Sequence, residues 1–255
     1  MPLCLKQRWN AYTDLDPVTY AVWVMVIGID HFFKRFESTT PIATLVAQCE
    51  GAVLELGPGM GNQIVHYDKD KVTRIIGVEY NPHFRSEIEA QVEKAGLGGT
   101  YELVTCGAEE SDVLERNGIG ASSMDTVLSI QVLCSVPDEK AMAREIYRIL
   151  KPGGKFIFWE HHVSSDWITR LYQSKWASCG HVLSGRGFLL IASTDATNPI
   201  WRRLIGGCCR NKDMYAALAA AGEWENFESI EGDADPAKPW VTLPRMWGVL
   251  VKAKK

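Results

Sequence analysis

The sequence predicts an α/β protein with a doubly wound, mostly parallel sheet. Short apolar runs of strand character alternate with helical patterns between residues 51 and 161, and a glycine-rich turn directly follows the first run. Parallel strands need crossover connections, which are usually helices, so this alternation favours a parallel sheet. The ligand of such a sheet is expected at the carboxyl ends of its strands.

The first two strands are marked by apolar runs with defined ends. Ala52–Leu56 ends at glycines, which is typical of a buried strand, and Val72–Glu79 ends at an acid. A helix is predicted over His83–Ala95, because apolar residues recur there at every fourth position.

Three further strands follow, with a long helix between two of them. Tyr101–Cys106 alternates in polarity, and Met124–Ile130 is the fourth predicted strand. A helix is predicted from Pro137 through Leu150, with the Lys151–Gly154 segment as its stop signal. Lys155–Glu160 is the fifth strand.

The C-terminal part is expected to complete a seven-stranded sheet. Phe227–Ile230 and Met246–Lys252 are predicted to form an antiparallel pair at its edge. We expect one domain over residues 50–255, preceded by a helical, apolar segment over residues 1–49. Residues 174–197 form an atypical insertion, rich in Gly, Ser and Thr, and are either a substrate lid or an artefact of gene prediction.

Composition excludes some classes of partner. The 255 residues are 46% hydrophobic and 23% charged, with a net charge of −4 and a pI near 5.9. Proteins that bind polyanions usually carry a basic excess, so no nucleic-acid partner is expected. The seven cysteines have no paired spacing, which favours a reducing compartment and a cytoplasmic location.

One apolar segment leaves two interpretations open. A helix over Pro17–Ile29 would span about 20 Å, which is short of a hydrocarbon core of about 30 Å. Asp14 and Asp16 stand where a signal peptide would carry basic residues. The segment either packs over the core or the ligand site, or lies on an intracellular membrane surface as a peripheral contact, with Trp23 and Phe32 as anchors.

The glycine turn narrows the class of ligand. Gly57, Gly59 and Gly61 are spaced G-x-G-x-G after Glu55, and Asn62 stands where the dinucleotide fingerprint requires its third glycine. A turn without side chains lets a ligand approach the backbone closely. An NAD-binding oxidoreductase is therefore disfavoured.

The strand ends indicate a nucleoside without a pyrophosphate. Glu79 lies 22 residues after Gly57, where it can accept hydrogen bonds from a ribose diol. Cys106–Glu110 can frame an adenine ring, while Gln131–Cys134 and Glu160–His162 follow the fourth and fifth strands. No basic residue is placed to bind a pyrophosphate, so S-adenosylmethionine fits this set of strand ends.

The ordered motifs resemble the class I S-adenosylmethionine-dependent methyltransferases, which have a Rossmann-like fold. The motifs that carry the resemblance are ELGPGMG, GVEYNP, CGAEE, DTVLSIQVLCSV and REIYRILKPGGKFIFWEHH. LCSVPDEK and the LKPGG strand resemble, more narrowly, the methyltransferase-like alkyl-thiol S-methyltransferases and their fungal relatives. The similarity extends over residues 50–255, with the insertion as its gap.

The resemblance implies a role for each strand end. It places the methionine moiety of the cofactor at the glycines, with Glu55 near its ammonium, the ribose at Glu79 and the sulfonium at Gln131. Ala108 and Glu109 would flank the adenine, although Glu110 could serve equally. A solvated acid at the end of a strand is the alternative for Glu79.

Methyl transfer to a thiol is helped by a base, because a free thiol is mostly protonated at neutral pH. His161 ends the fifth strand and would take that proton or stabilise the thiolate. A histidine bonded to a neighbouring loop is the equally weighted alternative, and His162 is expected to point to the opposite side. Trp201, Trp240 and Trp247 suggest an apolar wall for the substrate.

No metal site is predicted. Cys208 and Cys209 lie after Cys179 and His181 in the chain, but their spacing is not that of a C-x-x-C zinc motif. Metal-dependent catechol-type transfer is also disfavoured, because no acid cluster follows the fourth strand.

We therefore expect a methyltransferase that uses S-adenosylmethionine on a small, apolar thiol or hydroxyl compound. The alternatives are an O- or C-methyltransferase of a quinone, sterol or other natural product, and a protein that binds the cofactor but has lost catalysis. A nucleic-acid amino-methyltransferase is disfavoured, because SIQVLC stands where its Asn/Asp-Pro-Pro-aromatic motif would follow the fourth strand.

Overall fold

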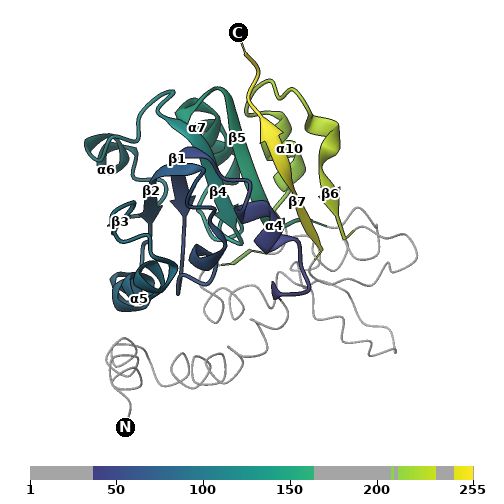
Figure 1. Cartoon of the computed structure of the whole chain (residues 1–255). Coiled ribbons are helices and arrows are strands. Elements are labelled where there is room, and N and C mark those ends of the chain that lie inside the picture. Colours follow the sequence, from purple (N-terminus) through teal and green to yellow (C-terminus); the bar gives the residue numbers. More distant parts are fainter. Residues whose placement is uncertain (1–36, 164–207, 210–211, 234–243, 255) are drawn as a thin grey trace, which may run out of the picture.

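The computed structural model describes residues 37–163, 208–209, 212–233 and 244–254. They form one seven-stranded sheet in the order β3-β2-β1-β4-β5-β7-β6, in which the first five strands are parallel (Figure 1). This confirms the predicted doubly wound fold class. The apolar segment over residues 17–29, the insertion over residues 174–197, Trp201 and Trp240 lie outside the described residues.

The elements have the following bounds. The strands are β1 Gly51–Leu56, β2 Val72–Val78, β3 Tyr101–Val104, β4 Met124–Ile130, β5 Leu150–His161, β6 Glu231–Gly232 and β7 Arg245–Val251. The α-helices are α4 Ile42–Val46, α5 Arg85–Ala95, α6 Ser111–Arg116, α7 Glu139–Ile149 and α10 Met214–Ala219. Short 3-10 helices are η1 Ile64–His66, η2 Pro82–Phe84 and η4 Phe227–Ser229.

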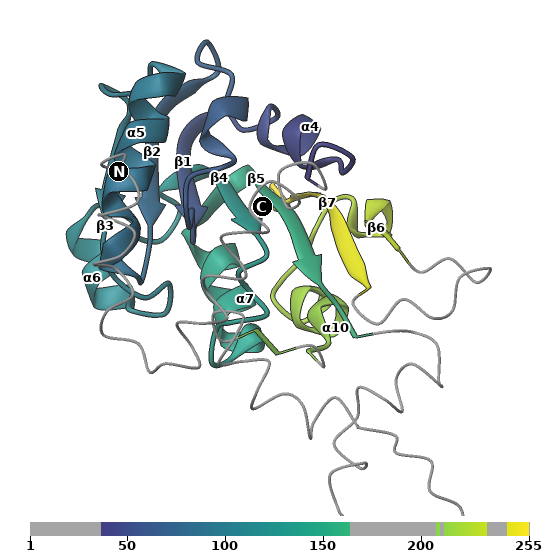
Figure 2. The same ribbon diagram turned by 90° about the horizontal axis from the view of Figure 1, so that it is seen from below.

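Two hydrophobic clusters cover the two faces of the sheet. One cluster packs α6, α7 and α10 against the strands, and the other packs α4, η1 and α5 against them. Seen from below, α7 and α10 lie on the opposite side of the sheet from α4 (Figure 2). Each predicted helix thus buries its apolar stripe, as Ile88 and Val92 do in α5. Among the described residues, no helix has the length and apolar character that crossing a bilayer demands.

The boundaries of α7 and β5 differ slightly from those predicted. Asp138, not Pro137, caps the helix, because its side chain accepts hydrogen bonds from the backbone nitrogens of Lys140 and Ala141 at 2.9 Å. The predicted stop segment belongs to β5, which begins at Leu150 and pairs with Met124. The register of this pairing shifts after Met124, which accommodates the glycines within the strand.

The prediction of a strand over Phe227–Ile230 was wrong. Residues 227–229 form η4, and β7, which pairs with β5 on one side, pairs with the two-residue β6 on the other. Asn226 explains the difference, because its side chain takes the place of a strand backbone. Its amide nitrogen donates to the Val249 carbonyl at 2.7 Å, and its oxygen accepts from the Val251 nitrogen at 2.9 Å. The predicted antiparallel arrangement of the C-terminal pair is confirmed.

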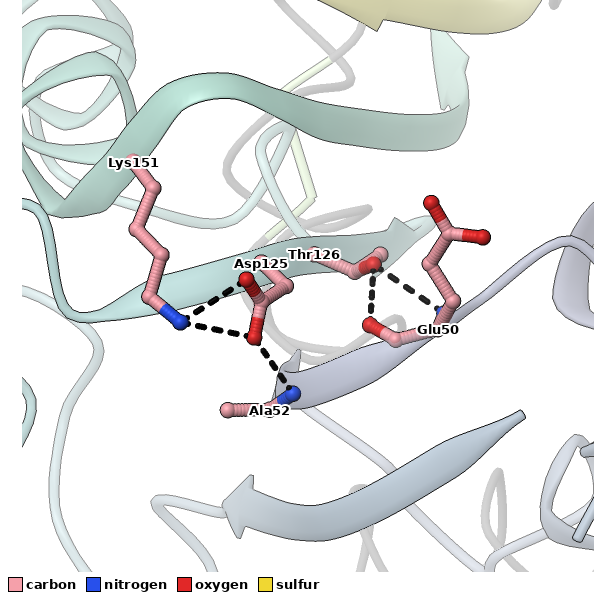
Figure 3. Close-up of polar contacts among 5 residues, drawn as sticks. All are labelled: Glu50, Ala52, Asp125, Thr126 and Lys151. Atoms are coloured by element: carbon pink, nitrogen blue, oxygen red, sulfur yellow. Dashed lines mark hydrogen bonds and ion pairs between the residues drawn. The ribbon is translucent and has the colours of Figure 1, made fainter. Parts of the chain in front are cut away.

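A polar brace joins the amino ends of β1 and β4 (Figure 3). Thr126 Oγ1 accepts from the backbone nitrogen of Glu50 at 3.2 Å and donates to its carbonyl at 2.8 Å. Asp125 Oδ2 accepts from the Ala52 nitrogen at 2.9 Å, and Lys151 Nζ lies 2.8 Å from both oxygens of that carboxylate. The brace fixes the register of β1 and thereby the position of the glycine turn at its other end.

Candidate active site

The glycine turn after β1 has a backbone that only glycine adopts readily. Gly57, Gly59 and Gly61 have φ angles of +54°, +57° and +75°. A Cβ atom on Gly57 would come within 2.8 Å of Val132 Cγ2, whereas one on Gly59 would meet no atom within 4 Å. Gly59 therefore leaves a space that a ligand can use.

Glu79 holds this turn from the end of β2. Its Oε2 accepts a hydrogen bond from the Gly59 nitrogen at 2.9 Å, and its Oε1 accepts one from the Asn81 nitrogen at 2.8 Å. The side chain is only 8% exposed, and burial raises the pKa of its carboxyl above the usual value. The alternative of a solvated acid at the strand end is therefore wrong.

Glu55 is directed away from solvent. It is 2% exposed, and its Oε2 accepts a hydrogen bond from the Tyr101 hydroxyl at 2.8 Å. Burial raises the pKa of the Glu55 carboxyl to about 7, although the bond from Tyr101 favours its charged form. Its predicted role near the ammonium of the cofactor stays a prediction.

In the turn after β3, Glu109 and Glu110, which the sequence left as alternatives, have different surroundings. Glu110 Oε1 accepts a hydrogen bond from the Gly107 nitrogen at 2.6 Å, so this acid is part of the turn. Glu109 is exposed beside the buried Ala108. Tyr80, which the sequence analysis missed, follows Glu79 directly and is 77% exposed. An exposed aromatic face at this edge of the sheet can cover a planar base.

Gln131 and His161 lie together at the ends of β4 and β5. Gln131 has a φ of +59° and donates its backbone N–H to the Trp159 carbonyl at 2.9 Å. Its Nε2 lies 3.2 Å from His161 Nε2. The Nδ1 atom of His161 lies 3.5 Å from Cys208 Sγ, and the histidine is 7% exposed. The structure therefore brings together two residues that the sequence placed separately.

The loop over residues 131–136 is held by buried charges. Glu160 Oε1 accepts from the Ser129 hydroxyl at 2.7 Å and from the Val132 nitrogen at 2.9 Å. Lys212 is 8% exposed and donates through Nζ to the carbonyls of Leu133 and Val136. Burial raises the pKa of the Glu160 carboxyl. Lys212 could not be predicted from the sequence, because it follows the insertion and belongs to no motif.

Comparison with known proteins decides the family. A family described as "Methyltransferase domain" matches residues 54–158. Thiol S-methyltransferase TMT1B of Rattus norvegicus is 33% identical over 244 residues, which cover 93% of this chain and 86% of the relative. The chain belongs to the class I methyltransferases, close to the thiol S-methyltransferases. TMT1B of Homo sapiens is 28% identical over 204 residues, which cover 79% of this methyltransferase and 70% of the relative.

A more distant relative is also a methyltransferase, and a solved structure has the same fold. The 24-methylenesterol C-methyltransferase 2 of Oryza sativa subsp. japonica is 27% identical over 195 residues, which cover 76% of this methyltransferase and 47% of the relative. An O-methyltransferase family protein from Burkholderia thailandensis has the same fold, with a TM-score of 0.56 and 11% identity, over 97% of this chain and 63% of that one.

Fold and family imply S-adenosylmethionine as the methyl donor. The residues present are compatible with it, because a buried carboxylate and a glycine-rich turn with open space at Gly59 lie at adjacent strand ends. The chain is therefore an S-adenosylmethionine-dependent methyltransferase.

Proposed function

We propose that S-adenosylmethionine binds across the carboxyl ends of β1 and β2. The ribose hydroxyls donate to Glu79, and the methionine moiety lies against Gly57, Gly59 and Gly61. The contact between Glu79 and Gly59 supports this placement most strongly. Each carboxylate oxygen has lone pairs beyond the one used by the backbone, so Glu79 can accept from the ribose and still hold the turn.

The adenine lies at the end of β3 in this proposal. Ala108 presents a small apolar surface, Glu109 accepts from the amino group of the base, and Tyr80 covers one of its faces. The exposure of Tyr80 and Glu109 supports this arrangement, because both side chains are accessible from solvent at the same edge.

We propose a small, apolar thiol as the methyl acceptor, received beside Gln131 and His161. The 33% identity to a thiol S-methyltransferase over nearly the whole chain supports a thiol over an alcohol. The bound donor supplies an electrophilic methyl group on a sulfonium, so alignment of the acceptor supplies much of the rate. Gln131 positions the sulfonium end, and His161 takes the acceptor's proton or stabilises its thiolate.

A sterol is the second candidate acceptor, because a sterol C-methyltransferase is also similar to the chain. The alignment covers less than half of that relative, so we rank it below the thiol. The cytoplasmic location stays a prediction. The peripheral membrane contact also stays a prediction, since it rests on residues 17–29.

Calorimetric titration tests the donor site. We expect the full chain to bind S-adenosylmethionine and S-adenosylhomocysteine but not NADH, and Glu79→Ala to weaken both at least tenfold. Glu102→Ala is the matched control, because Glu102 is an exposed acid on β3 that pairs with Arg74 at 2.7 Å. Equal binding by wild type and Glu79→Ala would refute the ribose assignment.

Mass spectrometry of the products tests the acceptor. The full chain is incubated with the donor and with an alkyl thiol, its matched alcohol or a sterol. We expect a methyl thioether from the thiol and much slower reaction of the other two. Methylation of the sterol alone would replace the proposed acceptor with the second candidate.

A further inference from the structure

Three buried side chains of metal-binding type meet beside the proposed acceptor position. The ligand atoms of Cys134, His161 and Cys208 all lie within 4.8 Å of one another. Their side chains come from the loop after β4, from the end of β5 and from a segment almost 50 residues further along the chain. We propose that these residues bind a zinc ion that activates the acceptor thiol.

The geometry of the cluster suits tetrahedral zinc. Zinc lies about 2.3 Å from thiolate sulfur and about 2.0 Å from imidazole nitrogen, so tetrahedral ligands place these two atoms about 3.5 Å apart. His161 Nδ1 and Cys208 Sγ lie 3.5 Å apart. Two thiols and one imidazole also form a ligand set that favours zinc over magnesium or calcium, which prefer oxygen ligands.

The surroundings of the cluster orient its ligands. A histidine that binds zinc usually donates its other ring N–H to an acceptor. Gln131 lies 3.2 Å from His161 Nε2, and rotation of its amide by 180° presents the oxygen as that acceptor without moving the side chain. The Cys134 carbonyl accepts from the Cys209 nitrogen at 2.8 Å, which ties two of the ligand segments together.

A buried acidic side chain with an oxygen that is unpartnered within the described ranges lies beside the cluster. Glu160 precedes His161 and is fully buried, and its Oε2 has no hydrogen-bond partner among the described residues. A carboxylate oxygen buried in this way is costly unless a positive charge lies near it. A divalent ion held by the adjacent histidine supplies such a charge.

The described part of the chain supplies three ligands to this group, which is the arrangement of catalytic zinc sites that keep a fourth position open. The fourth position takes the sulfur of the acceptor, and this step rests on the proposed thiol function. With Nδ1 on the metal, His161 stabilises the acceptor thiolate through the zinc ion and does not act as the base, and the thiol releases its proton to water when it binds the metal. A sulfur electron pair then forms the bond to the methyl carbon, and the carbon–sulfur bond of the sulfonium breaks. Its electrons remain on S-adenosylhomocysteine, and the uncharged thioether leaves the metal.

Cobalt substitution tests the site without relying on activity. The full chain, reduced with a phosphine, is titrated with Co²⁺ while the visible bands of tetrahedral cobalt and the thiolate-to-cobalt charge-transfer band are recorded. We expect one ion per chain, and at least tenfold weaker binding in Cys134→Ala and Cys208→Ala. Cys49→Ala is the matched control, because Cys49 is equally buried but belongs to the hydrophobic cluster around α4, η1 and α5 and not to the three-residue group.

Each outcome decides one part of the inference. An absent tetrahedral spectrum, or one that persists in Cys208→Ala, would overturn the metal site. Circular dichroism and donor titration on the same samples show whether a variant has kept its fold. We expect ethanethiol to intensify the charge-transfer band, because it adds a third thiolate, and an unchanged band would overturn the acceptor role.

The proposed function can fail separately. Cobalt binding without methylation of any thiol would refute the thiol acceptor and leave the metal site standing. Thiol methylation at an unchanged rate after complete removal of metal by a chelator would leave the thiol acceptor standing and refute the activating role of the metal.

Discussion

The Glu79 carboxylate accepts a hydrogen bond from the backbone nitrogen of Gly59 at 2.9 Å, so the end of β2 holds the turn that follows β1. The second carboxylate oxygen holds the Asn81 nitrogen in the same way. One side chain therefore shapes both loops that border the proposed donor site. A substitution at Glu79 that keeps the shape of the side chain but removes its charge therefore tests the contribution of the charge to donor binding.

Glu79→Gln keeps one oxygen acceptor but introduces an NH₂ donor opposite a backbone N–H. We expect a loss of S-adenosylmethionine affinity of about 10- to 100-fold, because hydrogen bonds to a charged group contribute about 1.5–3 kcal/mol. Calorimetric titration measures this loss. If Glu79→Gln binds the donor as tightly as wild type, the carboxylate charge plays no part in binding.

Alanine substitutions at Gly59 and Gly57 should lower the unfolding free energy by different amounts. Gly59→Ala meets no atom, so its cost in unfolding free energy is the left-handed backbone alone, about 1–2 kcal/mol. Gly57→Ala adds a contact of 2.8 Å with Val132 and should cost more. Urea unfolding gives both values. Gly99→Ala is the control, because Gly99 has open space and no left-handed φ; equal losses in all three variants would refute this ranking.

The raised pKa of Glu55 predicts that the difference in stability between wild type and Glu55→Gln depends on pH. Its pKa is raised from 4.5 to about 7, so the folded chain holds a proton that the unfolded chain releases. Below about pH 4.5 Glu55 is protonated in both the folded and the unfolded chain, so its burial costs no free energy of ionisation. As pH rises to about 7, wild type should lose up to about 3 kcal/mol of unfolding free energy relative to Glu55→Gln. Above pH 7 the difference should stay constant.

Urea unfolding of wild type and Glu55→Gln at intervals from pH 4.5 to pH 8 measures this difference. Glu102→Gln is an informative control, because Arg74 lowers the pKa of the exposed Glu102 carboxyl and gives a small dependence of opposite sign. A difference between wild type and Glu55→Gln that does not change with pH would show that the pKa of Glu55 is the same in the folded and unfolded chains.

Lys212 should affect the acceptor side of the site more than the donor side. Lys212→Met leaves the carbonyls of Leu133 and Val136 without their donor, and we expect a loss of about 1–3 kcal/mol in unfolding free energy. Methyl-transfer turnover should fall, while donor affinity should change less than twofold. Lys140→Met serves as the control, because Lys140 is exposed on α7. A large loss of donor affinity in Lys212→Met would refute this division.

The sequence predicted most of the sheet and the ligand edge because these features are local. A buried strand is visible as an apolar run, and Glu79 was predicted because it ends one. The cluster of Cys134, His161 and Cys208 could not be predicted, since three separate segments meet there and their spacing follows no motif. The 3-10 turn at Phe227 was missed because Asn226 replaces strand hydrogen bonds with side-chain ones, which hydrophobic patterning does not reveal.

The brace between β1 and β4 also has a consequence for the order in which the protein assembles. Asp125 reaches the Ala52 nitrogen across 73 positions of sequence, and β1 lies between β2 and β4 in the sheet. Closing so long a loop is slow, because its entropic cost precedes the contacts that repay it. During synthesis, the glycine turn leaves the ribosome long before the strand that fixes its position. A nascent chain that stops short of β4 therefore has the donor motif but no organised donor site.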